Sequence, residues 1–174
     1  MAHKLKPNLA PGTKVNYARP MPDTQERAVS PLSPHLFVSN AAAAIDFYKR
    51  AFNAKELTRH AAPDGKRIMH ASLLINGMTL MLSDDFPEYS GKSSTPEALG
   101  GSPVILHLQV NEADPLFDQA VAAGATVTMP LQDQFWGDRY GQLKDPFGHK
   151  WSIGASVRKL SEQEIQEGAK AAFR

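Results

Sequence analysis

The sequence predicts an α+β fold built from two tandem β-α-β-β-β modules. Three observations predict it: one order of strand and helix patterns occurs twice, the two copies keep a nearly constant offset, and turn residues fall at matching places. We expect a single domain over residues 28–157, with module one at 31–84, a linker at 85–102 and module two at 103–156. The 174 residues can bury a sizeable core without disulfides or metals.

The first module opens with a strand and a helix. Leu36 and Val38 alternate with other side chains, as in a strand with one buried face, and Ser39 or Asn40 can cap the helix that follows. The helix is expected over 41–52, because its apolar side chains fall on one stripe. That stripe consists of Ala44, Ile45, Tyr48 and Phe52.

Three strands joined by tight turns complete the first module. Residues 63–65 read Pro-Asp-Gly, which is typical of a turn, and Asn76-Gly77 is a strong short hairpin signal. The strands are expected over 54–61, 66–75 and 78–83.

The second module repeats this order. One face of its first strand is formed by Val104, Leu106, Leu108 and Val110. Asp114 is expected to cap the next helix, with Pro115 as its first helical residue. A strand follows over 125–129, and residues 145–148 read as a type I turn before the last strand at 149–155.

The two modules match by simple counting. His35 and His107 differ by 72 positions, and Asn53 and Gly124, which each follow a helix, differ by 71. Asn and Gly are the residues that best tolerate the left-handed conformation expected there. The second helix has therefore lost one residue, and the rest of the register is kept.

Two segments lie outside the repeat. Residues 1–27 are rich in proline and lack an apolar period, which indicates an irregular arm. Residues 158–174 form a separate amphipathic helix, with Ser161 and Glu164 as a capping box and Leu160 with Ile165 as a hydrophobic staple. We expect its apolar face to dock on the body or on a second subunit.

Composition excludes several classes of function. The net charge is +1 and no run of Lys or Arg occurs, so no nucleic-acid partner is expected. No apolar stretch approaches the roughly 18 residues of a membrane span, so no membrane partner is expected. The chain has no cysteine, which rules out disulfides and thiolate chemistry and fits a cytoplasmic location.

The duplicated module resembles the vicinal oxygen chelate superfamily, which includes glyoxalases, bleomycin-resistance proteins and dioxygenases. Its PhnB-type, glyoxalase-like branch is similar in four strings within residues 31–155: AAIDFYKRAFNAKEL, IMHASLLINGMTLMLSDD, GGSPVILHLQV and FWGDRYGQLKDPFGHKW. The resemblance implies that each module curls its strands into a half-open cup and that the protein is a homodimer. It implies no particular chemistry, because this fold hosts many reactions.

The resemblance also implies where a metal would bind. In metal-using members the first and last strands of each module supply the ligands, and the corresponding positions here are Ser33, Met81, Ile105 and Ser152. Mg²⁺, Mn²⁺ and Ni²⁺ bind carboxylate or imidazole groups, which these side chains lack. We therefore expect no metal and no other cofactor; a divalent metal remains the alternative.

His35 and His107 are the first candidates for chemistry. Their strand neighbours are apolar and must pack under the helices, so both histidines are expected to point into the cups, beside Phe37 and Gln109. They can contact a ligand, carry a proton, bind a displaced metal, or simply be satisfied by neighbouring strands. His70 can face the cavity from its own strand, or it can be a structural strand histidine.

An aromatic cluster near residue 136 gives a second set of candidates. Aromatic rings with one guanidinium suit a planar or anionic ligand, although such rings also close sheet ends. Asp145 and His149 read as structural turn residues. The full set of expected ligand-binding residues is His35, Phe37, His70, His107, Gln109, Phe135, Trp136, Arg139, Tyr140 and Ser152.

Three functions fit these residues. The first is a protein that binds a small organic molecule in the cup without a metal, either to sequester it or to convert it by histidine acid–base chemistry. The second is a metal-dependent lyase, isomerase or dioxygenase-like enzyme with a displaced site at His35 and His107. The third is a non-catalytic dimeric scaffold.

Overall fold

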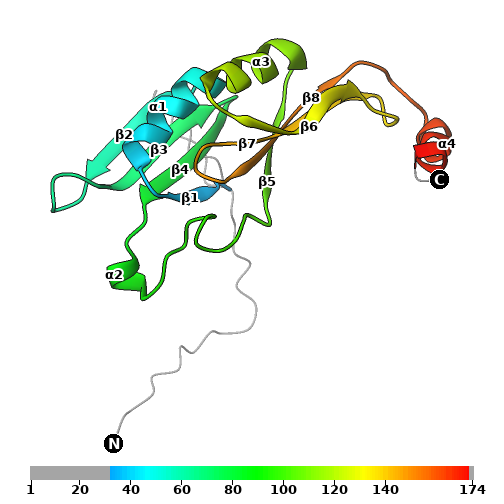
Figure 1. Ribbon diagram of the computed structural model, residues 1–174. Coiled ribbons are helices and arrows are strands. Elements are labelled where there is room, and N and C mark those ends of the chain that lie inside the picture. Colours follow the sequence, from blue (N-terminus) through cyan, green and yellow to red (C-terminus); the bar gives the residue numbers. More distant parts are fainter. Residues whose placement is uncertain (1–31, 173–174) are drawn as a thin grey trace, which may run out of the picture.

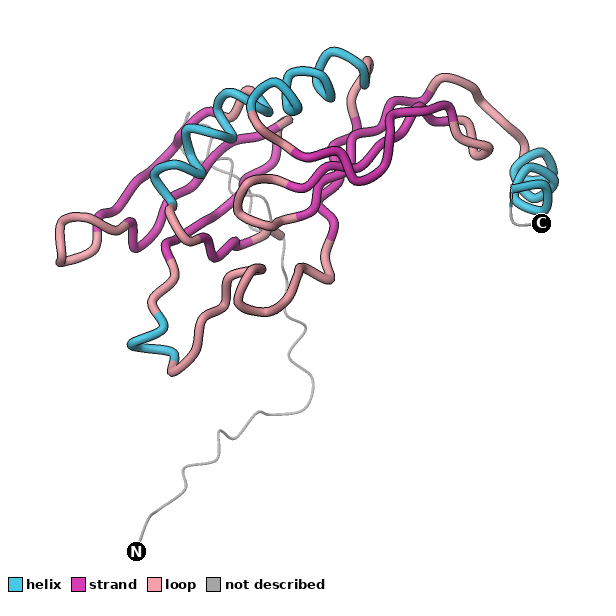
Figure 2. Tube along the Cα trace, in the orientation of Figure 1, coloured by secondary structure: helices cyan, strands magenta, loops and turns pink. Residues whose placement is uncertain are grey.

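The computed structural model describes residues 32–172. The expected N-terminal arm, residues 1–27, lies outside the described residues. Two four-stranded mixed sheets and their helices form the α+β architecture that the repeat predicts (Figures 1 and 2).

The first sheet has the strand order β1-β4-β3-β2. β1 pairs with β4 in parallel, and the other two pairs are antiparallel. Its strands are β1 (His35–Val38), β2 (Lys55–Ala61), β3 (Ile68–Ile75) and β4 (Met78–Asp84).

The second sheet has the matching order β5-β8-β7-β6, with β5 parallel to β8. Its strands are β5 (Ile105–Gln109), β6 (Thr126–Asp133), β7 (Asp138–Lys144) and β8 (Lys150–Ser156). The predicted duplication is confirmed by this identical topology.

One helix covers the inner face of each sheet. α1 (Ala41–Phe52) and α3 (Ala113–Ala123) lie side by side along one side of the molecule (Figure 1). Their ends exchange hydrogen bonds: Gln119 Nε2 donates to the carbonyl oxygens of Arg50 and Ala51, and Arg50 Nη1 donates to that of Ala123. Each helix therefore helps to satisfy the terminal carbonyl groups of the other.

The local signals at α1 are confirmed. Asn40 caps the helix, because its Oδ1 accepts a hydrogen bond of 3.0 Å from the Ala43 amide. Asn53 ends it in the left-handed conformation, at φ 54°. The predicted apolar stripe is buried along its whole length.

The two modules share one core. Phe52 of α1 packs against the Trp151 ring of β8, with ring centroids 4.4 Å apart, and Tyr48 contacts the same ring. Asp145, in the turn before β8, lies beneath these rings and is 3% exposed. Its Oδ2 accepts hydrogen bonds from Tyr48 Oη (2.7 Å) and Trp151 Nε1 (2.9 Å), and its Oδ1 accepts from two amides of its own turn. Burial, and then the Asp145 carboxylate, raise the pKa of Tyr48 well above 10.

Two further hydrogen bonds join the modules at repeat-related positions. His149 Nε2 donates to the carbonyl oxygen of Phe37 in β1, at 3.1 Å, and Asn76 Nδ2 donates to that of Gln109 in β5, at 2.8 Å. Phe37 and Gln109 are 72 positions apart (109 − 37). Each module therefore uses the turn between its last two strands to hold the first strand of the other.

Several local expectations for the second module are wrong. Glu112, not Asp114, is the N-cap of α3; Asp114 lies in the first turn, where it pairs with Arg139. Val104 lies outside β5 and is 60% exposed. β6 continues to Asp133, beyond the expected end at 129, because its pairing with β7 resumes at Gln132 and Asp133 after a register shift.

The linker and the C-terminus each carry a helix. α2 (Pro87–Ser90) is a single turn in the linker that no sequence signal predicted. α4 (Glu162–Ala172) lies apart from both sheets, beyond the end of the β6–β7 hairpin (Figure 2). Its predicted capping box is confirmed, since Ser161 and Glu164 exchange side-chain hydrogen bonds with each other's amides. None of its described residues is buried.

Candidate functional site

Each sheet has one face in the core and one face without a helix. We call the helix-free faces the module-one face, around His35, Phe37 and His70, and the module-two face, around His107 and Tyr140. The buried side chains of the same strands alternate with these residues, as Leu36 and Val38 do in β1 and Leu108 does in β5. The strand register therefore directs His35, Phe37 and His107 toward the helix-free faces, away from the helices, as the sequence predicts.

A row of rings crosses the module-one face. His35 stacks on Phe37 with ring centroids 5.3 Å apart, and His70 meets His35 edge-on at 5.6 Å. His60 of β2 continues the row, 6.3 Å from His70. His70 Nε2 also contacts Ser72 Oγ at 3.2 Å. Three strands thus contribute rings to one continuous surface.

His35 differs from His70 in its hydrogen bonding. Among residues 32–172, neither of its ring nitrogens has a hydrogen-bond partner. Burial, and secondarily the positive charge of a protonated His70, lower the pKa of His35 below 6.5. Its imidazole is therefore neutral at pH 7 and presents one donor and one acceptor.

The module-two face is built around a fixed imidazole. His107 Nδ1 lies 2.9 Å from Ser152 Oγ, and His107 Nε2 lies 2.9 Å from Gln109 Oε1. Both nitrogens are therefore engaged within the module. Gly154 allows the ring to lie close to β8, because a Cβ at this position would come within 3.0 Å of His107 Cε1.

Aromatic side chains extend this face toward the β6–β7 hairpin. Tyr140 stacks on His107 at 6.0 Å, Trp136 meets Tyr140 edge-on at 5.6 Å, and Phe135 meets Trp136 at 5.0 Å. Gln142 Nε2 donates to Tyr140 Oη. The second module thus carries its own row of rings, and the aromatic cluster noted in the sequence belongs to it.

Arg139 does not join this surface. Its guanidinium makes a bidentate pair with Asp114 of α3, and its Nη1 donates to Asp133 at 3.1 Å. In the register of β7 it pairs with Ala155, whose side chain is in the core, whereas Tyr140 pairs with Gly154. The hydrogen bonds from Arg139 lower the pKa of Asp114. The guanidinium is thus committed to holding α3 against the hairpin.

The candidate residues therefore form two groups in a single chain. His35, Phe37 and His70 lie together on one sheet, and His107, Gln109, Ser152, Tyr140, Trp136 and Phe135 lie together on the other. No described contact joins the two groups.

The positions at which the family resemblance implies metal ligands do not fit a metal ion here. Met81 and Ile105 carry no oxygen or imidazole donor, and the Ser152 hydroxyl is engaged with His107. Within residues 32–172, no three His, Asp or Glu side chains are grouped so as to hold a metal ion. The donor set at these positions therefore supports no metal-dependent step.

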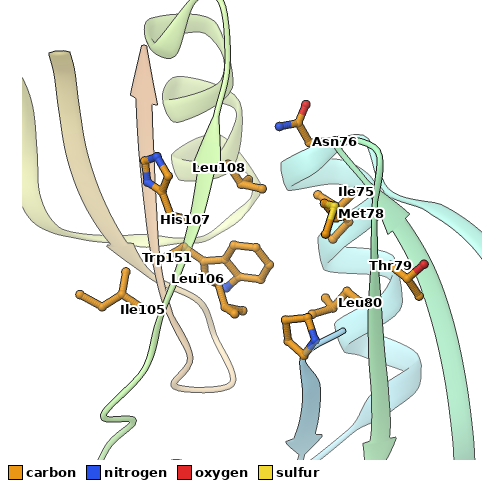
Figure 3. Close-up of a pocket in the computed structure, with 11 residues that line it drawn as sticks. Ile75, Asn76, Met78, Thr79, Leu80, Ile105, Leu106, His107, Leu108 and Trp151 are labelled. Carbon is orange, nitrogen blue, oxygen red and sulfur yellow. The ribbon is translucent and has the colours of Figure 1, made fainter. Parts of the chain in front are cut away.

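A cavity of about 240 Å³ lies between the modules, where the β3–β4 hairpin faces β5 (Figure 3). Its lining is mostly apolar, and its polar members are Asn76, Thr79 and His107. It includes Ile75, Met78 and Leu80 from module one and Leu106, Leu108 and Trp151 from module two. A second cavity of about 310 Å³ lies beside His35 and Phe37 and also reaches Ser94, Ser102 and Lys150. The side chains that line the cavity next to His35 include more polar groups than those that line the first cavity.

Sequence reasoning missed part of this arrangement. His60 was not singled out, although its spacing from His70 across the 63–65 turn is a signal for cross-strand pairing. Gln142 was also missed; its position two residues after Tyr140 places both on one strand face. The bridging role of His149 had no sequence signal, because its partner lies 112 residues away.

Comparison with known proteins identifies the class of protein. Residues 29–153 match the family described as the Glyoxalase/Bleomycin resistance protein/Dioxygenase superfamily. The chain belongs to this family, and the resemblance seen in the sequence is confirmed. Among the described residues, no helix has the length and apolar character needed to cross a membrane.

Individual relatives are similar over most of their length. An uncharacterized protein of Mycobacterium tuberculosis, Rv0887c, is 56% identical over 146 residues, which are 83% of this chain and 85% of the relative. Protein YjdN of Escherichia coli is 34% identical over 143 residues, covering 71% and 93%. The crystal structure of TioX from Micromonospora sp. ML1 has a TM-score of 0.57 at 29% identity, covering 72% and 98%.

Proposed function

We propose that this protein binds a small organic molecule with a planar ring on its helix-free sheet faces, without a metal at the positions used by metal-dependent relatives. The observation that supports the proposal most is the pair of ring rows built around His35 and His107. Rings that lie exposed on a sheet offer stacking surface to a planar ligand.

Charge on these faces supports a ligand with polar or acidic substituents. In the strand register, Lys55 pairs with Leu74 on the module-one face, and Lys150 pairs with Ile105 on the module-two face. Basic groups thus border both rows of rings.

We also propose that the protein is a homodimer. Each ring row is partly open to solvent in a single chain, since His35, Phe37 and His107 are exposed while His70 and Tyr140 are half-buried. A second copy can cover these open faces and give the ligand a second wall. Sedimentation equilibrium should then give twice the mass of 19.0 kDa of one chain; a monomer would contradict the dimer but leave the ring rows available.

Thermal shift with a panel of aromatic and acidic metabolites tests ligand binding. A ligand at about 100 times its dissociation constant stabilises the folded protein by about 2.7 kcal/mol, which raises the Tm by several degrees in a chain of this size. We expect Tyr140→Ala to abolish the shift. Tyr89→Ala removes the same side chain from α2, where Tyr89 is 83% exposed and contributes to neither ring row, and should keep it.

Two results would favour other functions. A stoichiometric divalent ion that copurifies and is lost in His35→Ala, measured by elemental analysis, would favour the metal-dependent enzyme. No shift with any compound of the panel would favour the dimeric scaffold.

A further inference from the structure

The repeat-related histidines have different surroundings because their neighbours have diverged. Ser152 and Gln109 hold the two nitrogens of His107. Their matching positions in module one are Met81 (152 − 71) and Phe37 (109 − 72). Neither side chain can hydrogen-bond an imidazole as Ser and Gln do.

Strand register shows that these are true structural counterparts. His107 pairs with Ser152 across β5 and β8, and His35 pairs with Met81 across β1 and β4. Gln109 and Phe37 each follow two positions later on the same strand, so they share the face of the histidine. The positions of these residues in the two sheets are thus duplicated, but the side chains that could hydrogen-bond the histidine are present only in module two.

We propose that His35 supplies the hydrogen-bonding nitrogen of the ligand site, for an uncharged polar group such as a hydroxyl or an amide, and that His107 serves only as a stacking surface. This inference rests on the proposed function for the existence of a ligand. The role of His35 follows from its two unengaged nitrogens, its stacking on Phe37 and its position beside the cavity of about 310 Å³. Neutral imidazole at pH 7 provides both a donor and an acceptor to such a group.

Diethyl pyrocarbonate tests the inference on the full chain without any ligand. The reagent acylates a neutral imidazole nitrogen and releases ethanol and carbon dioxide, and peptide mass spectrometry assigns the rate to each histidine. Both residues are exposed enough for the reagent to reach them, and partial burial of His35 works against its reactivity, so a faster His35 points to hydrogen bonding at His107. We expect His35 to react at least about tenfold faster than His107, because each nitrogen of His107 has a hydrogen-bond partner and the bond at the attacking nitrogen must open first.

Two double variants serve as matched controls. Ser152→Ala with Gln109→Ala frees both nitrogens of His107 and should raise its rate to near that of His35. Phe37→Gln with Met81→Ser gives His35 the neighbours of His107 and should lower its rate by about tenfold. The Ser152→Ala, Gln109→Ala variant only removes atoms and is therefore expected to fold. Its result tests the inference even if the Phe37→Gln, Met81→Ser variant folds poorly.

Equal rates in the natural protein, or a slow His107 in the Ser152→Ala, Gln109→Ala variant, would overturn the inference. The reactivity result is independent of the metabolite screen. A fast His35 with no ligand found would contradict the proposed function alone, whereas ligand binding with a slow His35 would contradict the inference alone.

Discussion

At the scale of single residues, two imidazoles in matching strands have been given different chemical states by their neighbours. His107 has both nitrogens engaged by Ser152 and Gln109, whereas His35 lies between Phe37 and His70 with its nitrogens unengaged. Residues that are equivalent in a repeat are therefore not equivalent in chemistry. The side chains at the neighbouring strand positions decide whether each imidazole is hydrogen-bonded.

The pH dependence of His35 follows from its surroundings. Burial, and then His70, lower the pKa of His35 in the folded protein, so the unfolded chain binds this proton more tightly. The free energy of unfolding therefore has its full value, as far as His35 is concerned, above pH 7. It decreases as the pH falls through 6.5 toward the lower pKa of His35 in the folded protein. The other ionisable groups on this face are His60, His70 and Lys55.

NMR titration of the imidazole signals measures this effect. We expect His35 to titrate below 6.5, and we expect His70→Asn to move its midpoint only part of the way back, because burial is the larger cause. A His35 midpoint at or above 6.5 in the natural protein would contradict this account.

At the scale of elements, similar capping signals have different consequences. Asn40 caps a helix whose stripe is buried in the core, and Ser161 caps α4, none of whose described residues is buried. Losing a cap destabilises a whole protein only when the helix is coupled to the core.

Two alanine variants test this difference. Asn40→Ala should lower the free energy of unfolding by about 1 kcal/mol, as measured by urea denaturation, and Asn40→Asp should restore most of it. Ser161→Ala should leave global stability unchanged and only speed amide hydrogen exchange within α4. A global loss of similar size in Ser161→Ala would show that α4 is coupled to the core.

At the scale of the whole molecule, the two modules share one buried core. The ring cluster of Tyr48, Phe52 and Trp151 crosses between them, and Asp145 satisfies the polar atoms within it. Neither module can bury its own rings without the other. We therefore expect a single unfolding transition by calorimetry.

Substitution of Asp145 tests the connection between the modules. Asp145→Ala leaves the Tyr48 hydroxyl, the Trp151 N–H and two turn amides without their acceptor, which should cost about 3–5 kcal/mol in urea denaturation. Tyr48→Phe removes one donor to the buried carboxylate and should cost about 1.5–3 kcal/mol. Two separate transitions in the natural protein would contradict the single unit.

Local chemistry explains which features could be predicted. The Asn40 cap, the left-handed Asn53 and the Ser161–Glu164 box each depend on residues within a few positions, so the sequence carries them completely. Arg139 shows the opposite case. Its aromatic neighbours in the sequence suggested that it binds a ligand, but its guanidinium pairs with Asp114, 25 residues away on α3.

The sequence by itself determined the duplication, the order of the elements and the strand faces on which the histidines lie, because these follow from side-chain period and short-range turn chemistry. Only the tertiary structure decided that Asp145 joins the modules, that Arg139 is committed to α3, and that His35 is unengaged while His107 is held. These outcomes depend on atoms brought together from distant strands, and a hydrogen bond between them forms or fails over a few tenths of an ångström, which no periodicity records.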